Sequence, residues 1–269
     1  MTTSNRSTKD APAAKCFAKE KFSFDDILKG LPVKRDLSRK LLSRLAFLIS
    51  EPSKTAMLEI GAAQGEVVIA CQELGYRCIG LEPFRMARDT AKQLADYLGV
   101  DIEIAGGVAE AMPFETESFD LVIALSVIEH VADVEKTFGE VYRVLKPGGV
   151  FCFNAASSMC PKQAEISGFP LFGWYPDPLK QKIIDWAKRN RPELIGYTDT
   201  PAINWFTSRK ARRLLLSHGF TKVLDRWDIF AEDVNMGRYR FPLRVISRSR
   251  LLKYLADVIF TTCSYAAVK

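Results

Sequence analysis

The sequence has few of the features that define secreted, membrane-spanning or zinc-binding proteins. Its six cysteines show no C-x-x-C spacing, so we expect them to behave as small buried hydrophobes rather than as metal ligands. No run of 18 or more apolar residues is present, and no transmembrane helix is expected. The N-terminal stretch lacks the apolar segment of a signal peptide. These absences favour a reduced, cytoplasmic setting without a bound metal.

Acidic residues are missing between Arg238 and Tyr254. The same stretch holds six basic residues, which equal the net charge of +6 of the whole chain, so the remainder is about neutral. Overlapping the end of this stretch, one predicted helical stripe carries Leu251, Leu252, Leu255, Val258 and Ile259. Two interpretations stay open: a lid helix packed on the protein core, or contact with an anionic membrane or a phosphate-bearing substrate. Nucleic acid is not expected, because the patch is local and no RNA-binding module accompanies it.

The most informative segment is a glycine-rich turn that follows a buried strand. The strand runs from Ala56 to Ile60, carries Glu59 near its end, and leads into a turn with Gly61 and Gly65. An unpaired charge is costly to bury, so an acid at the end of a central strand indicates a small-molecule site. The spacing is E-x-G-x-x-x-G, with Ala63 where nicotinamide-binding folds have their middle glycine.

Further elements follow in an order that predicts an α/β sheet. A second strand, 76–81, ends on Glu82, an acid placed to bind a ribose diol. Short and long strands are then expected at 101–105, 119–125 and 150–153. Helices are expected at 36–49, 65–74, 84–98 and 133–145, the last capped by Asp133 and ended by a breaker run at 146–149. A further helix is expected from Ser208, a candidate N-cap, to His218. The last two strands are predicted at 220–230 and 262–268, and 155–206 shows little periodicity.

The ordered motifs LEIGAAQG, GLEP, AEAMPF, SFDLVIALSVIEHV and VYRVLKPGGVF cover about residues 56–153. As a set they resemble the class I S-adenosylmethionine-dependent methyltransferases, in the branch of the quinone-biosynthesis enzymes. The resemblance implies a doubly wound, mostly parallel seven-stranded sheet with insertions after strand 5 and between strands 6 and 7. We expect a disordered tail at 1–21 and one domain over 22–269. Within it, 155–206 would be an acceptor-side insertion and 235–261 a basic amphipathic one.

The resemblance also implies the residues that hold S-adenosyl-L-methionine. Glu59 would anchor the donor's ammonium group, and Glu82 would bind both ribose hydroxyls. The backbone of Val108 and Ala109 would read the adenine. The other expected cofactor-binding residues are Gly61, Ala62, Ala63, Gly65, Pro83, Leu125 and Ser126. One departure is Val108 itself, because relatives often carry there an acid that binds the adenine amine.

His130 is the candidate catalytic base. It follows the fourth strand, and its ordinary pKa suits removal of a proton from a hydroxyl at neutral pH. The alternative is that His130 orients the loop or lines the pocket. His218 precedes Gly219 at a helix end, where a positive charge is favourable.

The acceptor is expected to be a small or lipid-linked molecule methylated at oxygen. The Asn-Pro-Pro-aromatic motif of many amino-nitrogen methyltransferases is absent, and Asn154-Ala155-Ala156-Ser157 stands after the fifth strand. Trp174, Tyr175 and Trp205 are the predicted substrate-binding residues, with a small core under a long loop as the alternative. The other class of function left open is a non-catalytic relative that binds the cofactor as a partner subunit.

Overall fold

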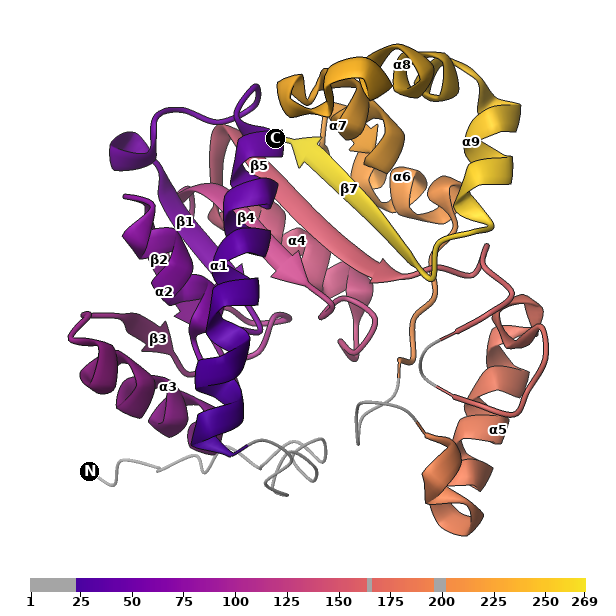
Figure 1. Ribbon diagram of the computed structural model, residues 1–269, viewed down its shortest axis with the longest axis horizontal. Coiled ribbons are helices and arrows are strands. Elements are labelled where there is room, and N and C mark those ends of the chain that lie inside the picture. The colour runs from indigo at the N-terminus through magenta and orange to yellow at the C-terminus, as the bar shows by residue number, and fades with distance from the viewer. Residues whose placement is uncertain (1–22, 164–165, 196–201) are drawn as a thin grey trace, which may run out of the picture.

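The structure is a computed structural model that describes residues 23–163, 166–195 and 202–269. Its centre is a seven-stranded sheet with the strand order β3-β2-β1-β4-β5-β7-β6 (Figure 1). The strands are β1 (Ala56–Ile60), β2 (Arg77–Leu81), β3 (Glu103–Ala105), β4 (Phe119–Leu125), β5 (Leu145–Ala156), β6 (Lys222–Asp225) and β7 (Thr262–Val268). Only β7 runs antiparallel to its neighbours. The predicted doubly wound, mostly parallel sheet is confirmed.

Both faces of the sheet are covered by helices, as the near-continuous apolar strands require. One face packs against α1 (Phe24–Leu45), α2 (Glu66–Glu73), α3 (Arg85–Leu98) and α7 (Arg226–Glu232). The other packs against α4 (Val134–Val144) and α6 (Ser208–Ser217). Successive side chains of β5 alternate between the two cores: Phe151 and Phe153 face α4 and α6, whereas Val150 and Cys152 face α1 and α2.

The short 3₁₀ helix η1 (Pro52–Lys54) precedes β1, and the remaining elements lie between β5 and β6 or between β6 and β7. They are α5 (Asp177–Asn190), α8 (Arg240–Arg248), α9 (Arg250–Asp257) and the 3₁₀ helices η2 (Phe172–Trp174), η3 (Pro192–Leu194) and η4 (Val234–Tyr239). Figure 1 shows α5 in a lobe beside the sheet and α8 and α9 close to the β7 side. None of the helices in the described ranges is long and apolar enough to cross a bilayer.

Several predicted boundaries were wrong. The strand expected at 220–230 ends at Asp225, because Asp225 and Asp228 form a reciprocal capping box that starts α7. The helix expected at 36–49 begins at Phe24, where Ser23 and Asp26 form another such box, and ends at Leu45. The N-cap of α6 is Thr207, not Ser208, since the Thr207 hydroxyl accepts from Lys210 N.

Other local expectations were confirmed, and two elements were missed. Asp133 caps α4 by accepting from Lys136 N, as expected. Residues 146–149, expected as a break, belong to β5, and α5 was not predicted. The single domain over 22–269 stays a prediction, as do the insertions at 155–206 and 235–261, and the tail predicted at 1–21 lies outside the described residues.

Candidate functional site

Glu59 lies near the carboxyl end of β1, in the centre of the sheet. Its side chain is 4% exposed, and its Oε2 atom has no hydrogen-bond partner among the described residues. Burial raises the pKa of Glu59 to about 8, against a smaller opposing effect of Lys34. A buried carboxyl group with an unsatisfied oxygen is costly unless a cation or donor pairs with it. The position is therefore suited to a positively charged ligand group.

Glu82 follows β2, the strand next to β1, and is also buried. One carboxylate oxygen accepts a hydrogen bond from Ala63 N at 2.9 Å, and the other accepts from Phe84 N at 3.0 Å. Burial raises the pKa of Glu82, whereas these two amides lower it. Each carboxylate oxygen can accept a second hydrogen bond, so the group is held in place with capacity left for two ligand hydroxyls.

The turn after β1 is too tight for larger residues. Gly61 has φ +74°, and a Cβ atom added there would lie 2.4 Å from Cγ2 of Val127. Gly65, with φ +77°, starts α2. Ala62 between them is buried, and its methyl group leaves no room for a Cβ at Gly80, 2.7 Å away. The turn is therefore closely packed against Val127 and β2, and it joins the ends of the strands that carry Glu59 and Glu82.

Two non-glycine residues at this edge of the sheet have a left-handed backbone. They are Ala63, with φ 46°, and Ser126, with φ 56°. Such conformations cost roughly 1 kcal/mol or more each and tend to occur where a ligand is held. Ser126 N also donates to the Asn154 side-chain oxygen at 2.5 Å, which joins the ends of β4 and β5.

The other predicted cofactor-binding residues lie along the same carboxyl edge. Pro83 is exposed immediately after Glu82, and Leu125 is half-buried at the end of β4. Val108 and Ala109 follow β3, with Val108 47% exposed and Ala109 buried. The structure thus brings together residues from the ends of β1, β2, β3 and β4, which is where open α/β sheets bind ligands.

His130 is half-buried in the loop after β4. Its backbone N donates to Val127 O at 2.8 Å. Two residues that precede α6 are hydrogen-bonded to this loop: Ile203 N and Asn204 N both donate to Glu129 O, at 2.8 and 3.0 Å. The loop that carries His130 is therefore fixed to the region between β5 and β6.

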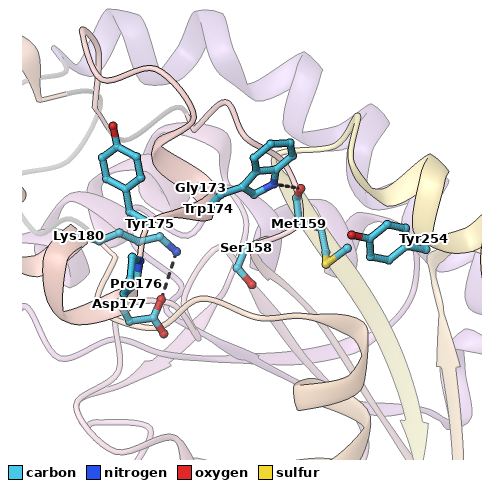
Figure 2. Close-up of a pocket in the computed structure, with 9 residues that line it drawn as sticks. All are labelled: Ser158, Met159, Gly173, Trp174, Tyr175, Pro176, Asp177, Lys180 and Tyr254. Carbon is cyan, nitrogen blue, oxygen red and sulfur yellow. Dashed lines mark hydrogen bonds and ion pairs between the residues drawn. The ribbon is translucent and has the colours of Figure 1, made fainter.

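An open cavity of about 410 Å³ lies beyond the carboxyl end of β5. Figure 2 shows its lining: Ser158, Met159, Gly173, Trp174, Tyr175, Pro176, Asp177, Lys180 and Tyr254. Trp174 donates through Nε1 to Met159 O at 2.8 Å, and Lys180 pairs with Asp177 at 3.1 Å. Two of the three predicted acceptor residues, Trp174 and Tyr175, line this cavity.

Trp205 does not line the cavity. It is 1% exposed and packs in a small core with Ile166, Phe172 and Ile184. The buried Lys180 ammonium lies 4.5 Å from the centre of its ring. Trp205 thus fits the alternative of a small core under a long loop. It contacts the cavity only indirectly, through the lining residue Lys180.

Seven of the nine lining residues were not predicted from the sequence, and Lys180, Asp177 and Tyr254 are the ones with functional side chains that extend the site. Lys180 and Asp177 belong to α5, whose amphipathic pattern was obscured by the surrounding prolines and aromatic residues. Tyr254 comes from α9, more than 70 positions later, and only the tertiary fold brings it to the same cavity. No group of three or more potential metal ligands exists within the described ranges.

Comparison with known proteins places this site in a family. Residues 58–153 match the model of a methyltransferase domain. The chain is 34% identical over 96 residues to an uncharacterised methyltransferase, YcgJ, of Bacillus subtilis (strain 168), covering 35% of this chain and 38% of that protein. It is 30% identical over 140 residues to a ubiquinone biosynthesis O-methyltransferase of Methylobacterium sp. (strain 4-46), covering 51% and 54%. The chain thus spans 38% and 54% of these relatives' lengths.

A solved structure agrees in fold. Phosphoethanolamine N-methyltransferase 2 of Haemonchus contortus, in complex with S-adenosyl-L-methionine, superposes with a TM-score of 0.55 at 18% identity, over 92% of this chain and 60% of that one. The segment that matches the methyltransferase domain contains Glu59, the glycine turn and Glu82. Over residues 58–153 the chain thus matches the methyltransferase domain, and its fold agrees with that of S-adenosylmethionine-dependent methyltransferases.

Proposed function

We propose that this chain transfers the methyl group of S-adenosylmethionine to an oxygen atom of a small-molecule, glycan or lipid-linked acceptor in the cytoplasm. The observation that carries the proposal is the pair of buried acids at the ends of adjacent parallel strands. Glu59 has an oxygen without a partner in the described structure, and Glu82 is held by two amides with capacity to spare. A cationic ammonium and a ribose diol are the groups that such a pair fits.

The residues of the glycine turn and the strand ends would hold the donor. Glu59 would bind its ammonium, through a water molecule, while the backbone from Gly61 through Ala62 and Ala63 to Gly65 runs beneath it. Glu82 would accept from both ribose hydroxyls. This division of roles follows from the depth of Glu59 in the sheet and the orientation of Glu82 by Ala63 N.

The adenine would lie farther along the same edge. The backbone amides of Val108 and Ala109 would meet its polar edge, and Pro83 and Leu125 would cover its faces, with Ser126 closing the end of the pocket. Val108 supplies no carboxylate for the adenine amine. We therefore expect adenine recognition to rest on the backbone at this position.

The donor supplies a methyl group on a sulfonium centre, which an acceptor oxygen attacks in line with the departing sulfur. Holding the two reactants close and aligned contributes several kcal/mol to lowering the barrier. The chain's own contribution would be this alignment and a proton acceptor. His130 would accept the hydroxyl proton, because its loop is bonded to Ile203 and Asn204, close in sequence to Phe206, whose carbonyl accepts from the cavity-lining Ser158.

The cavity beside α5 supports an organic acceptor. Its volume of about 410 Å³ lies within the usual range for small-molecule sites, and Trp174, Tyr175 and Tyr254 supply aromatic surface. Oxygen as the acceptor atom is supported by the O-methyltransferase relative and by Asn154. The Asn154 side-chain oxygen accepts from Ser126 N, and Asn154 is not followed by the Pro-Pro-aromatic sequence of many amino-nitrogen methyltransferases.

Calorimetry with S-adenosylmethionine tests the donor assignment. We expect Glu82→Gln to weaken binding by about 10- to 100-fold, because charge-assisted hydrogen bonds contribute roughly 1.5–3 kcal/mol. The matched control is Glu103→Gln, an exposed acid at the start of the neighbouring strand β3, which should bind as the unmodified chain does. An unchanged affinity in Glu82→Gln would overturn the ribose assignment.

Turnover is tested with donor carrying a labelled methyl group and extracts separated into polar and lipid fractions. We expect label in one product, which with unlabelled donor is 14 daltons heavier than its precursor, formed by the unmodified chain and not by Glu82→Gln. Attachment of the label to nitrogen or carbon would contradict the oxygen assignment. Donor binding without any transfer would favour the cofactor-binding partner subunit instead.

A further inference from the structure

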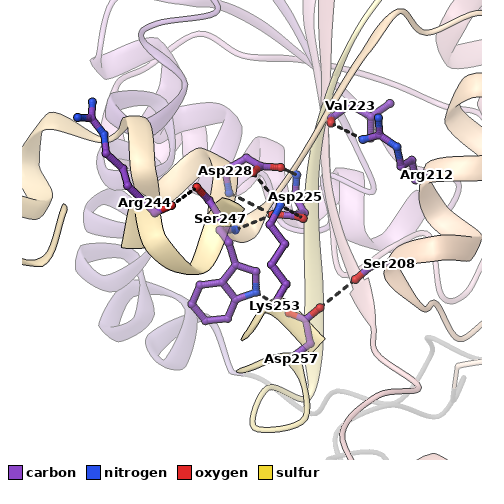
Figure 3. Close-up of polar contacts among 10 residues, drawn as sticks. Ser208, Arg212, Val223, Asp225, Asp228, Arg244, Ser247, Lys253 and Asp257 are labelled. Carbon is purple, nitrogen blue, oxygen red and sulfur yellow. Dashed lines mark hydrogen bonds and ion pairs between the residues drawn. The ribbon is translucent and has the colours of Figure 1, made fainter. Parts of the chain in front are cut away.

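The helix α9 is attached to the protein through its polar side. Lys253 Nζ lies 2.7 Å from a carboxylate oxygen of Asp225 and 2.7 Å from one of Asp228. One helical turn later, Asp257 accepts from Ser208 Oγ at 2.9 Å and from the Trp227 indole at 2.7 Å. Figure 3 shows these charged groups converging between α9, β6 and α7. The polar stripe of α9 therefore faces the body of the protein.

The apolar stripe of α9 consequently faces outward, and α8 continues it. Leu251 is 67% exposed, Leu255 55%, Ile259 76% and Phe241, on α8, 77%. Neither helix contains a buried residue. We call the exposed apolar side chains of the two helices the α8–α9 apolar surface; its members are Phe241, Val245, Leu251, Leu252, Leu255 and Ile259. A surface helix ordinarily turns such a stripe toward the core, so this orientation indicates a partner that covers it.

Basic residues border this surface. Arg244, Arg248 and Arg250 are exposed, and none of the three pairs with a carboxylate in the part of the chain that the structure describes. The other basic residues nearby are engaged: Lys253 is paired with two acids, and Arg240 donates to Ala231 O. The unpaired positive charge thus lies beside the apolar side chains and not toward the core.

We propose that α8 and α9 dock on an anionic lipid surface. Arg244, Arg248 and Arg250 would contact the phosphate headgroups, and the α8–α9 apolar surface would enter the boundary between headgroups and acyl chains. Charge favours lipid over a second copy of the chain. In a two-fold symmetric dimer the same patch meets itself, which would place these arginines against one another without a counter-charge.

The docking surface adjoins the acceptor cavity. Tyr254 belongs to α9 and lines the cavity, as Figure 2 shows at its right side. An acceptor with an apolar tail would therefore reach the cavity from the bilayer without crossing water. This consequence rests on the proposed function, whereas the docking itself does not.

Co-sedimentation of the full chain with vesicles tests the docking. Vesicles of phosphatidylcholine alone are compared with vesicles that also contain phosphatidylglycerol, at low and high salt. We expect sedimentation with the anionic vesicles only, and weakening at high salt because exposed charges are screened. No sedimentation with anionic vesicles at low salt would overturn the proposal.

Three variants separate the contributions. Arg244→Gln/Arg248→Gln/Arg250→Gln should lower the partition coefficient roughly 100-fold, at about tenfold or less per arginine. Leu251→Gln/Leu255→Gln should lower it as well, and both positions are exposed, so the fold is retained. The control is Arg39→Gln/Arg77→Gln/Lys92→Gln, which removes the same charge from exposed sites on α1, β2 and α3 and should sediment normally. Equal loss in this control would overturn a specific docking surface.

Two further measurements distinguish the alternatives. Sedimentation velocity without lipid should show no dimer that depends on Leu251 and Leu255; such a dimer, together with no vesicle binding, would replace lipid by a second copy. Donor affinity is measured in every variant and should stay unchanged. Vesicle binding by a chain that does not bind the donor would leave the docking standing and refute the proposed function alone.

Discussion

Two regions of the molecule place charged and apolar side chains in opposite ways: one buries acids, and the other exposes apolar side chains. Around β1 and β2, acids are buried at strand ends: Glu59 is 4% and Glu82 5% exposed. Around α8 and α9, charges anchor the helix inward while Leu251 and Phe241 lie open, at 67% and 77%. Both arrangements cost free energy in the isolated chain, since buried charge and exposed apolar area are each unfavourable. Each arrangement therefore indicates a binding partner. The buried acids suit the cationic group of a small molecule, and the exposed apolar side chains suit a large surface such as a membrane.

The region around α5 differs from both, because some of its aromatic residues are buried in a core and others line the cavity. Trp205 is fully enclosed, whereas Trp174 is 56% exposed at the cavity. Trp205→Ala should destabilise the chain by about 3–5 kcal/mol, as large cavities in a core do. Trp174→Ala should cost less than about 1 kcal/mol, because surface changes rarely cost more. Thermal or urea unfolding measures both, and equal losses would contradict the division.

The second largest effect is expected in the glycine turn of the donor half. Gly61→Ala would place a Cβ 2.4 Å from Val127, at a positive φ, so we expect about 2–4 kcal/mol of destabilisation from clash and strain combined. Donor affinity should fall at least about tenfold. Gly99→Ala is the matched control: its φ is +68° but no atom lies within 4 Å of the added Cβ. It should cost about 1 kcal/mol and bind the donor normally.

Calorimetry of both variants with S-adenosylhomocysteine, alongside their melting curves, makes the comparison. If Gly99→Ala weakened donor binding as much as Gly61→Ala, backbone strain alone would explain the effect. The close approach of the turn to a ligand would then be refuted.

The polar anchor of α9 should contribute less. Lys253→Met leaves Asp225 and Asp228 close together without their cation, and we expect a loss of roughly 1–3 kcal/mol in unfolding free energy. Arg250→Met, at an exposed position of the same helix, should change it by less than about 0.5 kcal/mol. Urea unfolding compares the two. A neutral Lys253→Met would show that the helix is not held by its polar side.

The smallest expected effect is the release of a proton from Glu59 when the donor binds. Because the pKa of buried Glu59 is raised from its ordinary 4.5 to about 8, the folded, ligand-free chain keeps this proton where the unfolded chain has lost it. Its contribution to stability is therefore full below pH 4.5 and declines as pH rises toward 8. At pH 6.5 the donor's amine is also protonated, so pairing it with Glu59 should release about one proton.

Calorimetry of donor binding in buffers with different ionisation enthalpies counts that proton. Glu59→Gln is the comparison, because it keeps the shape of the side chain and cannot ionise. We expect no release in that variant. A release that persists in Glu59→Gln would assign the proton to another group.

The donor half was largely predictable because its signals are local. A few consecutive residues, such as those around Glu59 and Gly61, are enough to indicate an apolar strand, an acid at its end and a glycine with positive φ. The roles of these residues remain proposals, but their convergence at one sheet edge followed from the strand order. The parallel strands had to bring their carboxyl ends together.

The C-terminal half was less predictable because its features depend on tertiary contacts. Lys253 and Asp257 look like ordinary exposed charges in the sequence, and only the positions of Asp225 and Ser208 reveal that they face inward. Trp205 and Trp174 are likewise indistinguishable by sequence. At 220–230 the apolar residues predicted a strand, but the capping box of Asp225 and Asp228 ends the strand at Asp225 and starts the helix α7.

The central claim is that the edge formed by β1, β2 and β4 holds the methyl donor. A crystal structure of the chain with S-adenosylhomocysteine tests it most directly. We expect the ribose hydroxyls within hydrogen-bond distance of the Glu82 carboxylate and the amino group on the Glu59 side of the glycine turn. Ligand bound away from this edge of the sheet, or bound there with its ribose away from Glu82, would contradict the assignment.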